Sequence, residues 1–286
     1  MSRRPSPEAD VDAALAVAAN LGLGDVQPVV LKVAHHTSVH LKPWPIVARV
    51  DSSFELERML PFMRRELDVA RHLAGKGAPS VRPARDPSPG PYAQARAAVT
   101  LWELVEHRRA DGRRDDVAAG RALAELHRGL SDYPGVLPQY TEGMETCSRM
   151  LDGPETLRAL TEDDRRFLAE TLAGLRSGLA VDRSSLMPLH GDAHPGNVMV
   201  TPAGAIWADL ETACLGPLEW ELTSLPPAAH AAFQPLDRDL FRRLGLLRSL
   251  TVAVWCWADV DRSPEIREAA EYHLRRLRRL SRKGLG

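Results

Sequence analysis

The sequence contains few cysteines and no long apolar run. Its 286 residues include three cysteines that lie far apart, and this number and spacing predict neither a disulfide framework nor a zinc site. No apolar segment approaches the roughly 20 residues of a membrane span, and the polar residues 1–7 lack the apolar core of a secretion signal. From these absences we expect a cytoplasmic protein that has no membrane partner.

A strong excess of charge of either sign is also absent. The formal net charge is −1, which gives no reason to expect nucleic acid as a partner. The residues are 44% hydrophobic and 26% charged, which is typical of globular proteins. The length is sufficient for one large domain or for two lobes. We take a monomer as the default expectation.

The first part of the chain is predicted to form a small antiparallel sheet together with two helices. Strands are indicated by short β-branched or apolar segments, and helices by apolar residues at three- and four-residue intervals. Proline at position 61 is expected to break the second helix into two pieces. The predicted strands are 29–33, 38–41, 46–50 and 97–105, and the predicted helices are 8–20 and 55–75.

Helices dominate the second part of the chain, with Asp115 or Asp116 expected to cap the first of them. A block of short strands and loops at 186–217 interrupts the series. We therefore predict an α+β protein with two lobes, an N-terminal lobe at 1–106 and a larger, mostly helical lobe at 107–286. The predicted helices of the second lobe are 115–130, 165–179, 240–259 and 265–282.

The most informative segment is 190–197, His-Gly-Asp-Ala-His-Pro-Gly-Asn, which is followed by Asp209 at the end of an apolar run. Phosphoryl transfer from ATP needs one carboxylate that orients a substrate hydroxyl. It also needs an amide and a second carboxylate that hold Mg²⁺ on the nucleotide phosphates. Asp192, Asn197 and Asp209 are the required residue types, and Glu211 is a candidate accessory ligand. The pattern predicts a catalytic loop.

These segments resemble the aminoglycoside phosphotransferase family, which comprises antibiotic and small-molecule kinases with a protein-kinase-like fold. The loop motif is highly specific to this superfamily, but it does not identify a substrate. A further segment, 120–127, is similar to the helix that begins the family's C-terminal lobe. The resemblance is carried by 190–197, by Ile206-Trp207-Ala208-Asp209 and by Gly216-Pro217-Leu218-Glu219-Trp220-Glu221-Leu222.

The resemblance implies a role for each matching residue. Asp192 would be the catalytic aspartate that accepts or orients the substrate hydroxyl, and Asn197 and Asp209 would bind magnesium. His190 would be structural, packed or hydrogen-bonded near Asp209. Glu221 stands where the family usually has an aspartate that braces the catalytic loop.

The N-terminal lobe of the family supplies a cation on its third strand and a carboxylate on the following helix. Arg49 takes the strand position, where lysine is commoner, and Glu66 is its expected partner on the helix. Arginine supplies the same charge as lysine with a different geometry. We therefore expect Arg49, supported by Glu66, to contact the nucleotide phosphates.

The remaining nucleotide contacts are implied by the resemblance. The turn before the second strand has no glycine, so Thr37 and Ser38 are the candidate hydroxyl and amide donors to the phosphates. Backbone groups from Glu103 to Val105 are expected to form the hinge that binds adenine.

The expected function is transfer of the γ-phosphoryl group of ATP to a hydroxyl of a small molecule, with an aminoglycoside-like antibiotic as one candidate acceptor. The expected cofactors are ATP, with GTP as the alternative nucleotide, and Mg²⁺. Two other functions stay open. His190, Asp192 and His194 could ligate the zinc of a hydrolase, with further ligands from His230 or His273; alternatively, the chain could bind a nucleotide without catalysis.

Overall fold

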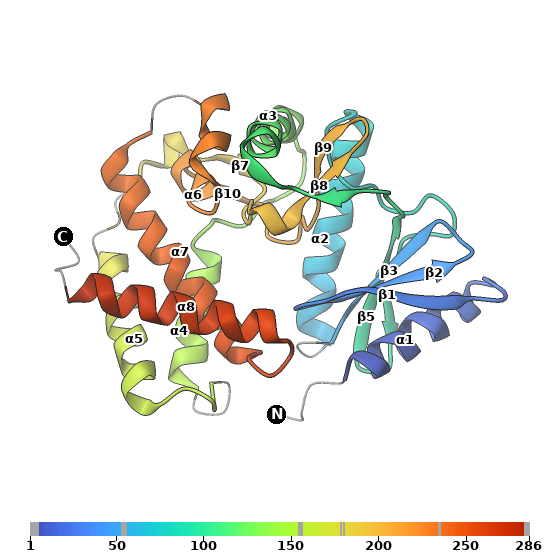
Figure 1. The fold of residues 1–286 in the computed structure, drawn as a ribbon, viewed down its shortest axis with the longest axis horizontal. Helices are drawn as coiled ribbons and strands as arrows, with labels where there is room; N and C mark the ends of the chain where they lie inside the picture. Colours follow the sequence, from blue (N-terminus) through green and yellow to red (C-terminus); the bar gives the residue numbers. More distant parts are fainter. Residues whose placement is uncertain are drawn as a thin grey trace.

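The computed structural model describes residues 6–52, 56–153, 157–177, 179, 181–233 and 236–282. Its two parts differ in size and in kind, as the sequence predicts. A five-stranded sheet with helix α1 (Pro7–Asn20) forms the smaller part, and helices with short strand pairs form the larger one (Figure 1). Helix α2 (Leu56–Gly75) lies between them.

The five-stranded sheet is antiparallel and has the order β1-β2-β3-β5-β4. It includes the four predicted strands and one short strand, β4, that the sequence analysis missed. Strand β1 forms an edge and is exposed along most of its length. The strands are β1 (Gln27–Val33), β2 (Thr37–Lys42), β3 (Ile46–Asp51), β4 (Tyr92–Gln94) and β5 (Ala97–Glu103).

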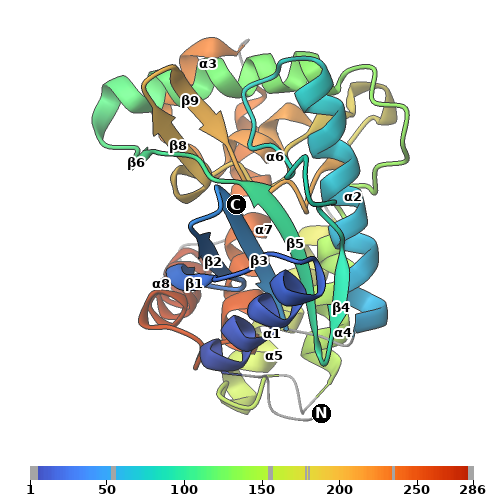
Figure 2. The same cartoon turned by 90° about the vertical axis from the view of Figure 1, so that its right-hand side faces the viewer.

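Helix α1 covers one face of this sheet (Figure 2). Ala13, Ala14 and Val17 pack against apolar side chains of the sheet, among them Val39 and Ala48. Because successive side chains of a strand point to opposite faces, the residues between those core positions point away from α1. Each strand residue can therefore be assigned either to the sheet face that α1 covers or to the opposite face.

Helix α2 is continuous through Pro61, so the prediction of a break at this proline is wrong. The proline lies in the second turn, where its missing N–H removes the hydrogen bond to a carbonyl group of the first turn only. The helix joins the two parts of the molecule. Met63 packs beside Ala98 of β5, whereas Leu67 and Leu73 belong to the core that also contains helix α3 (Gly112–Leu130).

The chain leaves the five-stranded sheet after Glu103 and at once joins the larger part. Strand β6 (Arg108–Arg109) pairs with β8 (Val198–Thr201), which pairs with β9 (Gly204–Trp207). A second pair consists of β7 (Met187–Leu189) and β10 (Cys214–Gly216). The two ladders hold the predicted block of strands and loops against α3.

The helices of the larger part surround this block. The four helices predicted there, α3, α5, α7 and α8, are present within three residues of the expected bounds, whereas α4 and the short α6 were missed. No helix in the described ranges combines the length and the apolar character that crossing a membrane requires. The helices are α4 (Glu142–Asp152), α5 (Glu162–Ser177), α6 (Leu218–Leu222), α7 (Arg238–Ala258) and α8 (Pro264–Ser281).

The start of α3 differs from the prediction that Asp115 or Asp116 caps it. The helix begins at Gly112, and Asp111 is the N-cap residue. The Asp115 carboxylate, one turn inside the helix, accepts hydrogen bonds from the Asp111 N–H at 2.8 Å and from the Arg108 guanidinium. The Asp115 carboxylate therefore accepts a backbone N–H at the start of the helix, although Asp115 is not the N-cap residue.

Candidate active site

The loop that begins at His190 is held by both nitrogens of the His190 ring. Its Nε2–H donates to the carbonyl of Ala208 at 2.9 Å, and its Nδ1 accepts the N–H of Asp192 at 3.3 Å. The ring is fully buried and lies edge-on to Trp207. His190 therefore joins the Asp192 loop to the strand before Asp209, which confirms the structural role predicted for it.

Asn197 closes the same loop at the end of a single 3₁₀ turn, Pro195–Asn197. Its side-chain Nδ2 donates to the Asp192 carbonyl at 3.0 Å, and its own carbonyl accepts the N–H of Ala208 at 2.9 Å. Because the amide nitrogen is engaged within the loop, the orientation of the carboxamide is defined and its Oδ1 is the atom that remains for a metal ion. The geometry suits the ligand role predicted for Asn197.

Gly191 adopts a backbone conformation that other residues rarely take, with φ of +88°. Its N–H donates to Oε2 of Glu221 at 3.2 Å, and a β-carbon here would meet the Thr212 carbonyl oxygen at 1.9 Å. Glu221 is fully buried and also contacts Nε2 of His127 at 3.5 Å. Glu221 thus braces the loop, as predicted from the sequence.

Arg49 connects the sheet to the larger part of the molecule. It lies on the sheet face opposite α1, because its neighbours Ala48 and Val50 are buried in the core on the α1 side. Its Nη1 donates to Oε1 of Glu66, and its Nη2 donates to Oδ1 of Asp209 at 2.6 Å. The structure thus pairs Arg49 with Glu66, whereas contact with a nucleotide stays a prediction.

One guanidinium, that of Arg49, pairs with three carboxylates in this cluster, those of Glu66, Asp209 and Glu211. Burial opposes the positive charge of Arg49, but Asp209, Glu66 and Glu211 outweigh it and raise the pKa of the guanidinium. Burial likewise opposes ionisation of Asp209, but Arg49 outweighs it and lowers the pKa of the carboxyl group. Both groups are therefore ionised at neutral pH. Asp209 has φ of +68°, and the N–H of the next residue, Leu210, donates to Glu66 at 3.2 Å.

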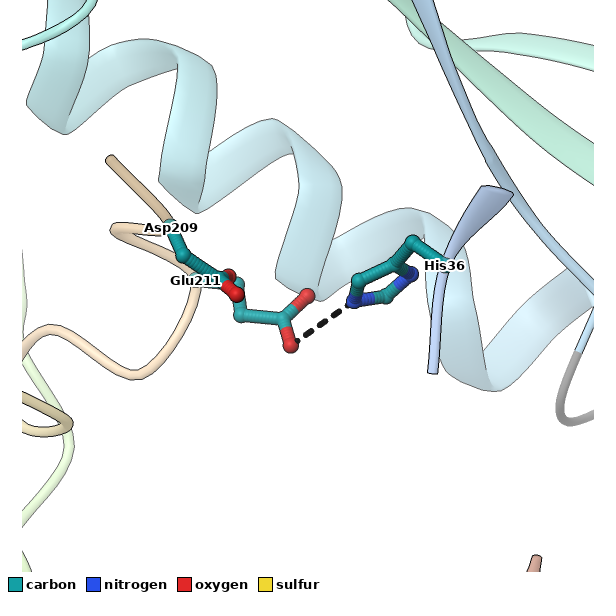
Figure 3. Close-up of side chains that lie close together, drawn as sticks. All are labelled: His36, Asp209 and Glu211. Carbon is teal, nitrogen blue, oxygen red and sulfur yellow. Dashed lines mark hydrogen bonds and ion pairs between the residues drawn. The ribbon is translucent and has the colours of Figure 1, made fainter. Parts of the chain in front are cut away.

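His36, Asp209 and Glu211 converge on one point (Figure 3). One potential ligand atom from each lies within 4.8 Å of the others, and Nε2 of His36 is 3.0 Å from Oε1 of Glu211. Two carboxylates offer the oxygen ligands that Mg²⁺ prefers, so the residues fit the divalent cation that the motif predicts. Sequence reasoning named Glu211 as an accessory ligand and did not single out His36.

The pleat of β2 separates the two hydroxyl residues predicted to contact phosphate. Ser38 is opposite Arg49 in the β2–β3 register and therefore shares its sheet face. Thr37 is fully buried, and its Oγ1 donates to Oδ2 of Asp10 at 2.5 Å and accepts from Nη2 of Arg262 at 2.7 Å. The hydroxyl of Thr37 is thus engaged within the protein.

The predicted hinge lies where β5 ends. The N–H of Glu103 donates to the Arg82 carbonyl at 2.9 Å, and the carbonyl of Val105 accepts from Nδ1 of His107 at 2.8 Å. The N–H of Glu103 and the carbonyl of Val105 are therefore both engaged within the protein. Recognition of adenine by its backbone stays a prediction.

The zinc site considered from the sequence has no support in the described residues. Both ring nitrogens of His190 are engaged in hydrogen bonds, and Nε2 of the partly exposed His194 is 3.6 Å from Oδ2 of Asp192. His230 donates to backbone carbonyls near the end of α6. In the described ranges, the one group of three or more His, Cys, Asp or Glu side chains close enough to share an ion is the His36 cluster.

The fold and the site together define a class of protein. The model of the phosphotransferase enzyme family (APH) matches residues 21–258, and the chain belongs to this family. The resemblance stated from the sequence is thereby confirmed. No curated protein sequence matches the chain.

Solved structures with a similar fold are kinases of small molecules. The amicoumacin kinase hAmiN, in a complex with AMP-PNP and Ca²⁺, is 13% identical, with a TM-score of 0.69 and 94% of each chain covered. The choline kinase LicA from Streptococcus pneumoniae is 12% identical, with a TM-score of 0.65, covering 93% of this chain and 97% of the other. The aminoglycoside phosphotransferase APH(3'')-Id from Streptomyces rimosus is 20% identical, with a TM-score of 0.63 and corresponding coverages of 85% and 98%. These likenesses confirm the protein-kinase-like fold.

Proposed function

We propose that this protein transfers the γ-phosphoryl group of ATP to a hydroxyl group of a small molecule. The observation that supports this most is the connection of the three motif residues through one hydrogen-bonded loop system. Asn197 donates to the backbone of Asp192, and the residue before Asp209 donates to the backbone of Asn197. An orienting carboxylate, an amide ligand and a carboxylate ligand are thereby linked, as phosphoryl transfer requires.

The nucleotide is proposed to lie between the five-stranded sheet and this loop. Residues 1–106 then form the nucleotide-binding lobe and residues 107–286 the catalytic lobe. Arg49 and Ser38 share one sheet face and would contact the phosphates, while the backbone from Glu103 to Val105 would contact adenine. ATP is the proposed donor, with GTP as the alternative. Two similar kinases have been crystallised with nucleotides, one with AMP-PNP and one with GDP.

A magnesium ion bound with the nucleotide would neutralise charge on the phosphate oxygens and hold them for in-line transfer. Asn197 and Asp209 are its proposed ligands, with Glu211 as an accessory. In this structure, Arg49 pairs with the carboxylates of Asp209 and Glu211 at 2.6 and 3.1 Å. If a bound cation pairs with these two carboxylates, the Arg49 guanidinium becomes available to contact phosphate.

Asp192 is proposed to act on the acceptor. Its carboxylate would accept a hydrogen bond from the acceptor hydroxyl and direct the oxygen lone pair at the γ-phosphorus. The new bond joins the hydroxyl oxygen to phosphorus, the bond from phosphorus to the bridging β–γ oxygen breaks, and ADP leaves. The hydroxyl proton passes to Asp192 or to water. Catalysis comes mainly from positioning and from charge neutralisation, and it needs no covalent enzyme intermediate.

The acceptor is proposed to be a small hydroxylated compound. The similar kinases named above act on amicoumacin, choline and aminoglycosides, all of which are small molecules. Their identities to this chain, at or below 20%, do not select one of these acceptors. An antibiotic is therefore one class to test beside amino alcohols and sugars.

The proposal is tested by nucleotide consumption. Purified protein with Mg²⁺ and ATP, and in parallel GTP, is assayed against panels of hydroxylated antibiotics, amino alcohols and sugars. Phosphorylated product is identified by mass spectrometry. Asp192→Ala is expected to abolish product formation while the nucleotide dissociation constant, measured by calorimetry, stays within about threefold because Asp192 contacts no nucleotide. Unchanged turnover in this variant would contradict the role of Asp192.

A nucleotide-binding protein without catalysis is separated by the same experiment. It would bind ATP with Mg²⁺ and form no phosphorylated product with any acceptor in the panels. A zinc hydrolase would instead contain tightly bound zinc after purification, measured by elemental analysis, and would show no nucleotide dependence.

A further inference from the structure

A buried arginine outside the sequence motif contacts the loop of Asp192. Arg248 lies in the middle of α7, and only 8% of its surface is exposed. Its Nη2 donates to the carbonyl of Gly191 at 2.7 Å, and its Nη1 is 3.5 Å from Oδ1 of Asp192. A single guanidinium therefore contacts both the backbone and the carboxylate at this point of the loop.

The position of the guanidinium is defined from the other side by Trp220 of α6. The charged carbon of Arg248 lies 3.7 Å from the centre of the Trp220 ring, and Nη2 is 3.4 Å from the Trp220 carbonyl. A cation over an indole ring is attracted by the ring's negative face. The planar fork is thus held between a ring and the loop, an arrangement that the point charge of a lysine could not reproduce.

Burial of this charge is unfavourable, which argues that it serves more than packing. Burial lowers the pKa of Arg248, and the nearby Asp192 and Glu221 offset this effect only in part. Its Nε has no hydrogen-bond partner among the described residues. An apolar side chain at the same position of α7 would avoid the desolvation cost. Such a side chain would lose the contacts of the guanidinium with the Asp192 carboxylate and with the Gly191 carbonyl.

The surroundings of Asp192 differ between its two carboxylate oxygens. Oδ1 faces Arg248, whereas Oδ2 faces Nε2 of His194 at 3.6 Å. Arg248 is buried and His194 is partly exposed, with 10% and 41% of their side chains accessible. About a third of the Asp192 side chain is exposed, at 34%. The buried side of the carboxylate is thereby occupied by the protein, and the open side is left for another molecule.

We propose that Arg248 is a positioning residue for the transfer reaction: it holds Oδ1 of Asp192 and the Gly191 carbonyl, so that Oδ2 is presented to the acceptor hydroxyl. This inference rests on the proposed function, because it assigns the acceptor contact to Asp192. Arg248 touches neither substrate nor nucleotide in this account. Its contribution is to the orientation of the carboxylate and should affect the chemical step more than nucleotide binding.

The test compares Arg248→Met, Arg248→Lys and a control variant in the wild-type assay. Arg248→Met is expected to lower kcat by about 100-fold, the size of effect that a misplacement of 1 Å can cause, with the nucleotide dissociation constant within about threefold of wild type. Arg248→Lys is expected to have an intermediate kcat, because it restores the charge but not the two-point fork. Leu277→Ala, which truncates a fully buried side chain of α8, controls for lost stability and should leave kcat nearly unchanged at a temperature where it is folded.

Each outcome bears on the proposal separately from the proposed function. A folded Arg248→Met variant with wild-type kcat would overturn it, as would parallel losses of kcat and nucleotide affinity that Leu277→Ala reproduces. If Arg248→Met does not fold, Arg248→Lys decides, and wild-type kcat in that variant overturns the proposal. Failure of the wild-type protein to phosphorylate any acceptor, by contrast, would count against the proposed function.

Discussion

Arg49 of β3 and Asp209 of the loop after β9 form an ion pair of 2.6 Å that joins the two lobes across 160 residues of sequence. The guanidinium at the same time contacts Glu66 of α2, so one cation unites strand, helix and loop. In the proposed reaction both partners acquire new contacts, Arg49 with phosphate and Asp209 with the metal ion.

Replacement of Arg49 should weaken nucleotide binding. Arg49→Met is expected to raise the dissociation constant for ATP with Mg²⁺ by about 10- to 100-fold, which corresponds to about 1.4–2.7 kcal/mol. Arg49→Lys should lose less, because it keeps the charge. Calorimetry measures both, with Arg166→Met as the control, since Arg166 forms an exposed ion pair with Asp163 within α5. Wild-type affinity in Arg49→Met would exclude a phosphate contact.

Asp209 should make nucleotide binding dependent on the divalent cation. Wild-type protein is expected to lose most of its ATP affinity when Mg²⁺ is removed with a chelator. ATP binding by Asp209→Asn should no longer depend on the Mg²⁺ concentration. The measurement is a titration of ATP at several Mg²⁺ concentrations. A mutant whose response to Mg²⁺ equals that of the wild type would remove Asp209 from the proposed metal site.

Gly191→Ala should damage the loop of Asp192. The added methyl group would meet the Thr212 carbonyl oxygen at 1.9 Å, and φ of +88° is unfavourable for alanine. Strain of this kind costs on the order of 1–3 kcal/mol per residue, and the displaced loop should lower kcat as well. Gly174→Ala in α5 is the matched control: no neighbour lies near its β-carbon position, and alanine favours the helix by up to about 1 kcal/mol. Equal stability of the two variants, measured by denaturation, would contradict the account.

Asp10→Asn should destabilise the contact between α1 and the loop before α8. The Asp10 carboxylate is fully buried, pairs with the nearly buried Arg262 and accepts hydrogen bonds from Thr37 and Ser52. Removing one partner of a buried ion pair costs about 3–5 kcal/mol, because the other charge stays buried. Denaturant unfolding of Asp10→Asn, Arg262→Met and the double variant measures the coupling. Additive effects in this cycle would show that the pair is not coupled.

His273 should contribute a loss of stability in mild acid. Burial, and then the charge of Arg276, lower the pKa of this ring to about 4, whereas an unfolded histidine titrates near 6.5. Below pH about 6.5 the unfolded state binds a proton that the native ring does not, so stability is lost until about pH 4. The full loss is up to about 3 kcal/mol. His273→Leu should flatten this part of the stability–pH curve, and an unchanged slope would contradict the assignment.

Local patterns were sufficient to predict most elements and to select the loop 190–197 as the candidate catalytic loop. The strands of the sheet and the long helices α5, α7 and α8 have apolar repeats that are visible in the sequence without any knowledge of how the elements pack. The loop 190–197 is recognisable because its residues are consecutive and act through their own backbone, as the hydrogen bond from Asn197 to Asp192 shows. The prediction of a break at Pro61 failed because it considered the residue and not its place near the start of the helix.

Contacts between distant segments could not be predicted in this way. Thr37 and Ser38 are adjacent hydroxyl residues in the sequence, yet the strand pleat directs one to Asp10 and the other to the face of Arg49. Arg248 belongs to no sequence motif, so the sequence does not distinguish it from other polar residues in predicted helices. Its contact with Asp192 depends on the packing of α7 against the loop.

The residue types of the proposed site, the apolar repeats of the elements and the family could all be read from the sequence, because each of these depends on neighbours along the chain. Only the tertiary structure decided which charges meet: Arg49 with Asp209, Asp10 with Arg262 and Arg248 with Asp192. Charge pairing depends on distances of a few ångströms between segments that may be separated by as many as 252 residues. Those distances follow from the packing of whole helices and strands, which no local pattern contains.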